Sequence, residues 1–329
     1  MRGSSPLRPG RGATITRRGF AAALLAILAA CRGRGGAWIH PYGVAEPLVG
    51  RIFDVQRGRF VDENRLVVAL RAARYVILGE THDNADHHRL QARLLRALAP
   101  GPPRLRAVIF EMLDLDQQEQ LVEHLDLLRK APDRFAAAIG WEQGGWPPFA
   151  IYEPVFRAAL EVGAEIVAGG LPPRLVKAVS ERGFMALPPR LARATGLQEP
   201  LPPQLRQALE ERLFAAHCGR LARDFLPRMV AVQRARDALL AERLVTLSGQ
   251  GRGALIAGRG HARIDWGVPY YLRRLAPEAA VRSLAFLEVG TVAPERLRDQ
   301  PYDFLWLTPR AHPESYDPCR GITTPSRPT

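Results

Sequence analysis

At 329 residues, of which 47% are hydrophobic, the chain is long enough to bury one large core or two modest ones, and its composition is not that of a disordered protein. The net charge of +13 suits an acidic ligand or an anionic lipid. No basic run is interleaved with aromatic residues, so we expect no nucleic-acid partner. The three cysteines are too few for a disulfide scaffold and lack metal-finger spacing.

The amino terminus is predicted to be an export signal, residues 1–30. Residues 2–18 are basic, and Arg17 and Arg18 stand just before an apolar run at residues 20–30. A run of this length is too short to cross a bilayer as a helix but suits a signal peptide. The paired arginines are similar to those of a twin-arginine signal, and general secretory export is the alternative.

The end of this run resembles the lipobox of bacterial lipoproteins, because residues 28–31 are Leu-Ala-Ala-Cys. It predicts cleavage before Cys31 and a lipid on the Cys31 thiol. The mature protein would then be exported and membrane-anchored in the bacterial cell envelope, at the periplasmic face or the cell surface. Gly-rich residues 31–49 are expected to form a tether. Outside the cytoplasm, Cys218 and Cys319 either form a disulfide or remain free thiols.

From residue 50 onward, apolar runs typical of strands alternate with segments of helical spacing. A hairpin is expected at residues 51–61, and a proline-punctuated helical segment at residues 180–228. Helices are also expected at residues 114–128 and from Leu226 onward. The remaining strands are expected at residues 75–78, 107–110, 164–168, 254–257, 283–289 and 303–307. This order predicts an α/β protein with a mainly parallel sheet flanked by helices, with an additional helical segment, over residues 50–319; residues 320–329 form a tail.

Ionisable side chains follow three of the expected strands where each strand ends. They are Glu80, His82, Glu111 and His261. Ligands of an open parallel sheet bind beyond the carboxyl ends of the strands, so these four side chains are expected to meet at one edge. Each histidine stands three residues after a glycine, Gly79 or Gly258, where glycine lets the chain turn sharply.

Two carboxylates and two imidazoles form a ligand set that suits Zn, Mn, Co or Fe, with positions left open for water or substrate. Alternatively, one glutamate acts as general base on a metal-bound water. Each residue also has a plainer interpretation. Glu80 or Glu111 would be the negative charge at a helix N-terminus, and His261 would hydrogen-bond within a loop.

His87 and His88 begin the helix that follows this first turn. At about 100° per residue, His87 falls on the apolar face of the helix, and His88 lies at its border beside Gln91. Each histidine is either a hydrogen-bonded core residue or a ligand close to Glu80, and both interpretations stay open. Gln91 is expected to support the site.

The long helix that begins at Leu226 carries Gln233 and Asp237 among apolar neighbours, with Arg236 adjacent. Buried polar groups need hydrogen-bond partners, so these residues are expected to support the site. Arg236 would either pair with a carboxylate near the sheet edge or form an ordinary surface salt bridge.

Five motifs together resemble those of one protein family. They are Leu-Gly-Glu-Thr-His-Asp-Asn-Ala-Asp-His-His (78–88), Phe-Glu-Met-Leu (110–113), Gly-Gly-Trp-Pro (144–147), Gln-Arg-Ala-Arg-Asp (233–237) and Ala-Gly-Arg-Gly-His-Ala-Arg-Ile-Asp-Trp-Gly-Val-Pro (257–269). From about Gly50 to Cys319 the chain resembles the ChaN-like haem-binding uptake lipoproteins of the Tiki/TraB superfamily.

The resemblance implies a role in iron uptake, with haem or another small ligand as the partner. It also implies a homodimer that holds a cofacial pair of haems, with a tyrosine on iron and His or Lys near the propionates. Tyr152, Tyr270 and Tyr271 are the candidate iron ligands, and His87 and His88 are candidate haem contacts. Lysine occurs only twice, so arginine would have to replace it.

A second branch of the superfamily is enzymatic. Tiki-type metalloproteases and related hydrolases use two Gly-x-x-His motifs and a glutamate, a pattern similar to Gly79–His82, Gly258–His261 and Glu111. The leading hypothesis is a membrane-anchored haem-binding lipoprotein for iron uptake. The alternative is a metal-dependent hydrolase with Zn, Mn or Co, in which Glu80, His82, Glu111 and His261 are catalytic.

Overall fold

The computed structural model describes residues 37–320 of the chain. The predicted signal peptide, Cys31 and the tail at residues 321–329 lie outside the described residues. The described residues 38–320 belong to one compact unit. Within the described part, no helix has both the length and the apolar character needed to cross a membrane.

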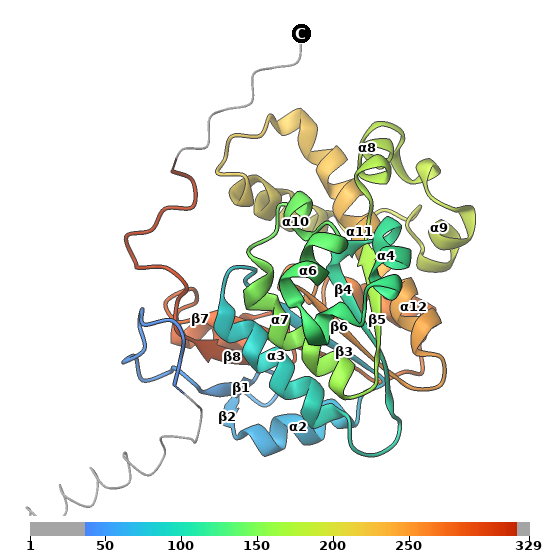
Figure 1. The fold of residues 1–329 in the computed structure, drawn as a ribbon. Helices are drawn as coiled ribbons and strands as arrows, with labels where there is room; N and C mark the ends of the chain where they lie inside the picture. Colours follow the sequence, from blue (N-terminus) through green and yellow to red (C-terminus); the bar gives the residue numbers. More distant parts are fainter. Residues whose placement is uncertain (1–36, 321–329) are drawn as a thin grey trace, which may run out of the picture. The chain divides into compact units, whose positions relative to one another are not determined.

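A mixed sheet lies at the centre of this unit, with strand order β2-β1-β8-β7-β3-β6-β4-β5 (Figure 1). The strands are β1 (Ile52–Asp54), β2 (Arg59–Val61), β3 (Tyr75–Glu80), β4 (Leu105–Asp114), β5 (Glu165–Gly170), β6 (Arg252–Gly258), β7 (Val281–Glu288) and β8 (Phe304–Thr308). Strands β3 to β8 run parallel, and β1 pairs antiparallel with both β8 and β2. The prediction of a mainly parallel α/β sheet is confirmed.

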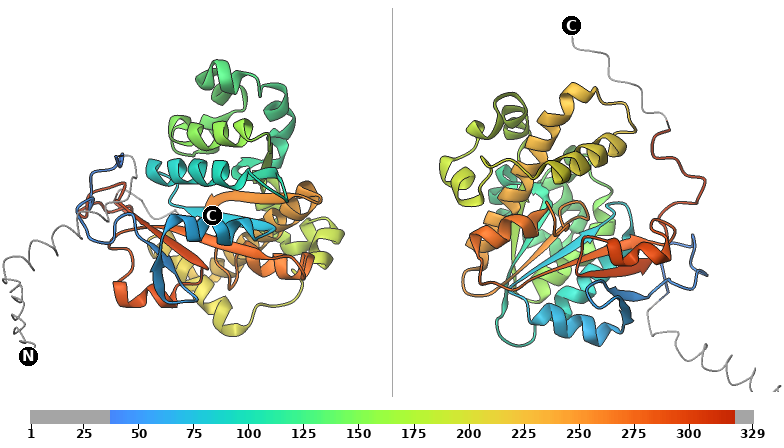
Figure 2. Two further views of the ribbon diagram at one scale, coloured as in Figure 1. Left: turned by 90° about the horizontal axis from the view of Figure 1, so that it is seen from below. Right: turned by 180° about the vertical axis from the view of Figure 1, so that it is seen from behind.

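Helices cover both faces of the sheet (Figure 2). One face carries α2 (Glu63–Arg71), α3 (Ala85–Leu98), α6 (Pro132–Ala138) and α7 (Phe149–Glu161). The other face carries α8 (Pro173–Arg182), α9 (Pro189–Thr195), α11 (Leu226–Ser248) and α12 (Val268–Leu275). Helix α10 (Pro203–Ala216) packs on α11 and, with α8 and α9, makes up the helical segment expected at residues 180–228.

The central strands are buried on both faces, which explains their unbroken apolar runs. In β3, Val76 and Leu78 enter the core under α3, whereas Tyr75 and Ile77 enter the core under α11. Successive side chains of a strand point to opposite faces, and a parallel sheet covered on both sides needs apolar residues at every position. The chain can therefore place polar side chains only at the strand ends.

The prediction of one helix over residues 114–128 was wrong, because this region contains a strand end, a 3₁₀ turn and two short helices. Strand β4 extends through Asp114, whose backbone N–H donates to the Gln117 side chain at 2.7 Å. A 3₁₀ turn and two short helices follow, α4 (Gln118–Glu123) and α5 (Leu127–Lys130). The turn begins here because Gln117 satisfies the backbone at the strand end and its own amide bonds the Ile139 carbonyl at 2.6 Å.

The amino-terminal segment of the described chain packs against the domain. The backbone N–H groups of Ile39 and His40 both donate to the buried Asp86 carboxylate, at 2.9 and 3.0 Å. Tyr42 forms an isolated bridge with Arg310. The part of the expected tether at residues 38–49 therefore contacts the fold.

Cys218 and Cys319 form a disulfide, the first of the two alternatives. Cys218 lies just after α10, and residue 319 ends a segment that follows the last strand. The bond thus joins the end of this segment to the helical layer.

Replacing both cysteines with serine is expected to lower the free energy of unfolding by about 2 kcal/mol. A cross-link that spans 101 residues stabilises by restricting the unfolded chain, by about 2–4 kcal/mol in typical cases. We expect the lower figure because residues 309–320 add no strand or helix to the sheet. Guanidinium unfolding with and without dithiothreitol measures the effect. The double serine variant should be insensitive to the reductant, and an equally stable reduced wild-type protein would contradict the prediction.

Candidate functional site at the carboxyl ends of β3, β4 and β6

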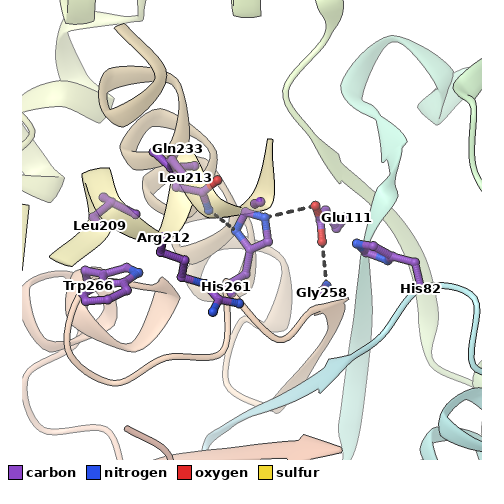
Figure 3. Close-up of a pocket in the computed structure, with 11 residues that line it drawn as sticks. His82, Glu111, Leu209, Arg212, Leu213, Gln233, Gly258, His261 and Trp266 are labelled. Atoms are coloured by element: carbon purple, nitrogen blue, oxygen red, sulfur yellow. Dashed lines mark hydrogen bonds and ion pairs between the residues drawn. The ribbon is translucent and has the colours of Figure 1, made fainter. Parts of the chain in front are cut away.

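The four ionisable residues predicted to meet do lie together at one edge of the sheet. Glu80 ends β3, Glu111 lies near the end of β4, and His261 follows β6 by three residues. His82 lies in the turn after β3 and faces Glu111 across Gly258, as Figure 3 shows. The parallel register of β3, β6 and β4 is what brings these chain-distant residues to one edge.

A pocket of about 180 Å³ opens between this edge and helix α10 (Figure 3). His82, Glu111 and His261 form its inner end, with Gln233 of α11 beside them. Helix α10 and the loop before α12 supply the remaining wall. Those residues are Leu209, Arg212, Leu213, Ala216 and Trp266.

The two glycines of the Gly-x-x-His units allow close approach of neighbouring groups. Gly258 also begins the expected turn, because its carbonyl accepts from the His261 backbone N–H at 2.9 Å, whereas Gly79 lies within β3. A Cβ on Gly79 would lie 2.9 Å from the Arg259 Cα, and a Cβ on Gly258 would lie 2.8 Å from the His82 Nε2. The small residue at each position therefore lets the two strand ends and the His82 ring come together.

His261 lies between two buried carboxylates. Its Nε2 is 3.0 Å from Glu111, and its Nδ1 is 2.6 Å from Asp237 of α11. Gln233 contacts both His261 and Asp237, at 3.2 and 3.3 Å. Both ring nitrogens face acceptors, so the arrangement favours the doubly protonated imidazolium.

The charges of this triad shift the pKa values of its members in opposite directions. Burial alone would lower the pKa of His261, but the Glu111 and Asp237 carboxylates outweigh it and raise the pKa to about 10. Burial would raise the pKa of Glu111, but the His261 charge and the Gly258 backbone N–H, which donates to Glu111 at 2.7 Å, hold it at about 2. His261 and Glu111 are thus ionised together over a wide pH range, whereas burial raises the pKa of Asp237.

Stability is expected to fall on the alkaline side because of His261. A raised pKa stabilises the fold fully below the ordinary value of 6.5, and this contribution disappears as the pH rises through about 10. Glu111 acts in the opposite sense, so its contribution is present above 4.5 and lost as the pH falls through about 2. The pKa values of His82 and His88 are raised as well and add a loss of the same sign, so the contribution of His261 is the difference between the wild type and His261→Gln. Urea midpoints should fall from about pH 6 to about pH 10, less steeply in His261→Gln; an equal slope would contradict the assignment.

Glu80 is the centre of a second, adjoining network. Its carboxylate accepts from the Tyr152 hydroxyl at 2.9 Å and from the Gln91 amide at 2.6 Å, and it lies 3.1 Å from both His82 and His88. Burial would raise the pKa of Glu80, but the His88 charge and these hydrogen bonds bring it well below its ordinary range. Gln91 also donates to the Leu78 carbonyl at 3.0 Å and so joins Glu80 to the backbone of β3.

His87 and His88 are both fully buried and engaged within the protein. His87 Nδ1 accepts from the Thr81 backbone, and its Nε2 donates to the Thr308 hydroxyl at 2.8 Å. Burial lowers the pKa of His87 well below its ordinary value, whereas Glu80 overcomes burial and raises that of His88. Ligation of haem by either ring would require these hydrogen bonds to open.

The three predicted tyrosines differ in accessibility. Tyr152 and Tyr271 are 0% exposed, and burial raises the pKa of each phenol. Tyr152 is held by Glu80, and Tyr271 accepts from Arg234 at 3.2 Å. Tyr270 alone of the three is partly exposed. Its ring lies 5.6 Å from the Arg273 guanidinium.

The three residues of α11 that were expected to support the site differ in their contacts. Gln233 and Asp237 contact His261, as expected. Within residues 37–320, Arg236 makes no ion pair within 4.0 Å, and its charge acts at longer range on Asp114. The buried arginine of this helix is Arg234, which donates to the Glu199 carbonyl at 2.7 Å.

The described residues contain no group of three or more His, Cys, Asp or Glu side chains arranged to hold a metal ion. The acids and imidazoles are paired with one another: His261 with Glu111 and Asp237, and His82 with Glu80. A metal at His261 would replace the direct contact between the ring and a carboxylate, and that carboxylate would be a second ligand. In the described residues these acids and imidazoles form direct charge pairs.

Two residues near the site were missed in the sequence, one that contacts His82 and one that lines the pocket. Trp146 contacts the His82 ring edge-on at 4.9 Å between centroids, and Arg212 enters the pocket from α10. Trp146 belongs to the Gly-Gly-Trp-Pro motif, which could have marked it. Arg212 carries no such signal, because nothing local distinguishes it from the many other arginines.

Comparison with known proteins agrees with this geometry. Residues 66–272 match the family model described as haem-binding uptake, Tiki superfamily, ChaN. ChaN of Campylobacter jejuni, whose structure is titled for cofacial heme binding, has a TM-score of 0.63 and 18% identity, covering 78% of this chain and 95% of its own. This likeness shows a shared fold.

Two other solved structures are less similar. The type III effector HopBA1 has a TM-score of 0.40 at 13% identity, covering 74% of this chain and 91% of its own. An erythromycin esterase EreC mutant in its open conformation has a TM-score of 0.39 at 15% identity, covering 82% of each chain. No curated protein sequence matches the chain. The family match spans more than half of the chain, which therefore belongs to the ChaN family of haem-binding uptake proteins in the Tiki superfamily.

Proposed function

We propose that this protein binds haem in the bacterial cell envelope and serves in iron uptake. The observation that carries the proposal is the match of residues 66–272 to the haem-binding uptake family. The lipobox-like residues 28–31 support anchoring of the mature chain by a lipid on Cys31. Metabolic labelling with a radioactive fatty acid tests the anchor: the label should be present in the wild type and absent in Cys31→Ser.

The size of the pocket supports binding of haem outside it. Ligand pockets that enclose a cofactor-sized molecule measure about 300–1,000 Å³, whereas this one measures about 180 Å³. Haem would therefore bind at an outer face and be covered by a second copy of the chain. The cofacial arrangement named for the Campylobacter protein supports such a homodimer.

Tyr270 is the proposed iron ligand. Of the tyrosines within the matched residues 66–272, Tyr75, Tyr152 and Tyr271 are buried, and Tyr270 is partly exposed. Arg273 and Arg274 follow it on the same short helix. The Arg273 guanidinium can pair with a propionate in the role that the scarce lysines leave open, whereas Arg274 is already paired with Glu199 at 2.7 and 2.5 Å.

A haem titration followed in the Soret region tests this assignment. Tyr270→Phe should change the Soret maximum and weaken haem binding by at least about tenfold, since it removes an iron ligand but little packing. Tyr316→Phe is the matched control, because Tyr316 is 50% exposed and lies outside the matched residues. An unchanged spectrum in Tyr270→Phe would remove this residue from the proposal without removing haem binding.

One observation favours a second candidate function, hydrolysis. His82, Glu111 and His261 line a single pocket, as acid–base or metal-assisted hydrolysis requires. Metal analysis of the purified protein tests the metal-dependent form. Stoichiometric Zn, Mn or Co that is lost in both His82→Ala and His261→Ala would favour it, and absence of bound metal after equilibration with each ion would oppose it.

A further inference from the structure

Arg212 presents an unpaired guanidinium to the pocket. The residue lies on α10 and reaches solvent, and Figure 3 shows its side chain passing between Trp266 and His261. Among the described residues it has no hydrogen-bond or ion-pair partner. A guanidinium carries five N–H donors in a planar fork that matches a carboxylate. The N–H groups of Arg212 are therefore free to donate to a ligand in the pocket.

The surroundings of Arg212 are also positively charged. Partial burial and the nearby charges of Arg259 and Arg263 lower the pKa of Arg212. Asp265 is close, but Arg263 already binds its two oxygens at 3.0 and 2.6 Å. Arg259 donates to the Thr81 hydroxyl, which brings no negative charge. An anion at this position would relieve the repulsion among the three guanidinium groups.

The wall next to Arg212 is apolar. Leu209, Leu213 and Ala216 of α10 line one side, and Trp266 lies opposite Arg212 with Arg263 stacked on its ring at 3.6 Å. The pocket measures about 180 Å³, below the range of about 300–1,000 Å³ for pockets that enclose a drug-sized ligand. There is room for a short hydrocarbon segment beside the charged end, but not for a large ring system.

We infer that this pocket binds a small organic acid, with the carboxylate on Arg212 and the carbon chain against Leu209, Leu213 and Trp266. The apolar wall favours an organic carboxylate over inorganic phosphate, whose oxygens would all need polar partners. The inference goes beyond haem binding and does not depend on it.

Butyrate is the probe, with formate and inorganic phosphate as comparisons. Binding to the purified full chain is followed by line broadening of the probe's proton resonances, or of the ³¹P resonance for phosphate, at low salt. Butyrate should bind more tightly than either comparison ion. Arg212→Gln should weaken butyrate binding by about tenfold, the effect of one charge-assisted hydrogen-bonded pair. Arg190→Gln is the control, because Arg190 is exposed and does not line the pocket.

Arg212 has no partner within the described chain, so its replacement should leave the fold intact, which circular dichroism checks. Unchanged butyrate binding in Arg212→Gln would overturn the inference. Phosphate binding as tight as that of butyrate would overturn the assignment to an organic acid. Equal weakening in Arg190→Gln would show general charge attraction and would also overturn it.

Haem carries two carboxylates of its own, so a competition experiment separates the sources. If haem propionate fills the pocket, haem will displace butyrate and haem dimethyl ester will not. If a free organic acid fills it, butyrate will bind with unchanged affinity to the haem-saturated protein. Either result supports the binding of a carboxylate in this pocket. The two results differ only in which molecule supplies that carboxylate.

Discussion

Replacing His261 with alanine is expected to lower the free energy of unfolding by about 3–5 kcal/mol. The substitution leaves Glu111 and Asp237 facing each other without the imidazolium between them, and both carboxylates are buried. Removing one partner of a buried charge pair costs far more than the pair contributes, because the remaining charge has lost its hydration. Guanidinium unfolding at about pH 6 measures the loss.

Two variants make this prediction specific. His124→Ala removes a histidine at the surface that bonds only a backbone carbonyl of its own helix, so it should change stability by less than about 1 kcal/mol. Adding Glu111→Gln to His261→Ala should restore part of the loss, because one of the two unpaired charges is gone. Strictly additive losses in the double variant would show that the three groups do not act as one charge network.

Replacing Arg252 with methionine is expected to lower the free energy of unfolding by a similar amount, about 3–5 kcal/mol. The side chain is 1% exposed and donates to the carbonyls of Ala73, Leu98 and Arg71 at 3.1, 2.9 and 2.5 Å. Each buried acceptor left without a donor costs about 1–3 kcal/mol. Methionine keeps most of the volume, so the measured loss isolates these hydrogen bonds.

Arg252 begins β6, the strand whose other end leads to His261, so its loss should also loosen the pocket. Thermal and guanidinium unfolding of Arg252→Met and of the exposed control Arg190→Met test the claim. The control should stay within about 0.5 kcal/mol of the wild type. A loss of under about 1 kcal/mol in Arg252→Met would mean that water replaces the missing donors.

The strands and the sheet edge were predictable because two-sided burial leaves a strong sequence signal. Val76 to Leu78 form an unbroken apolar run only because helices cover both faces of β3. Once the strands were parallel, the carboxyl ends had to meet, and Glu80, His82, Glu111 and His261 met as expected. The grouping of these residues thus followed from topology alone.

Which of the site's side chains contact one another was not predictable from the sequence. His261 lies between Glu111 and Asp237 because α11 brings Asp237 next to the end of β6. The periodicity of a sequence predicts a helix, but it does not predict where that helix lies relative to a strand end. The same holds for Arg212, which reaches the pocket only because α10 packs on α11. Accessibility separates Tyr270 from its neighbour Tyr271, two residues that no local pattern distinguishes.

Sedimentation velocity with detection in the Soret band tests the central claim most directly, that two copies of this chain hold haem. The mature protein is mixed with one equivalent of haem and followed at both the protein and the haem wavelength. We expect haem to sediment with the protein at twice the protomer mass, with one haem per chain. Haem that remains at the meniscus, or a protein that binds none at equilibrium, would contradict it.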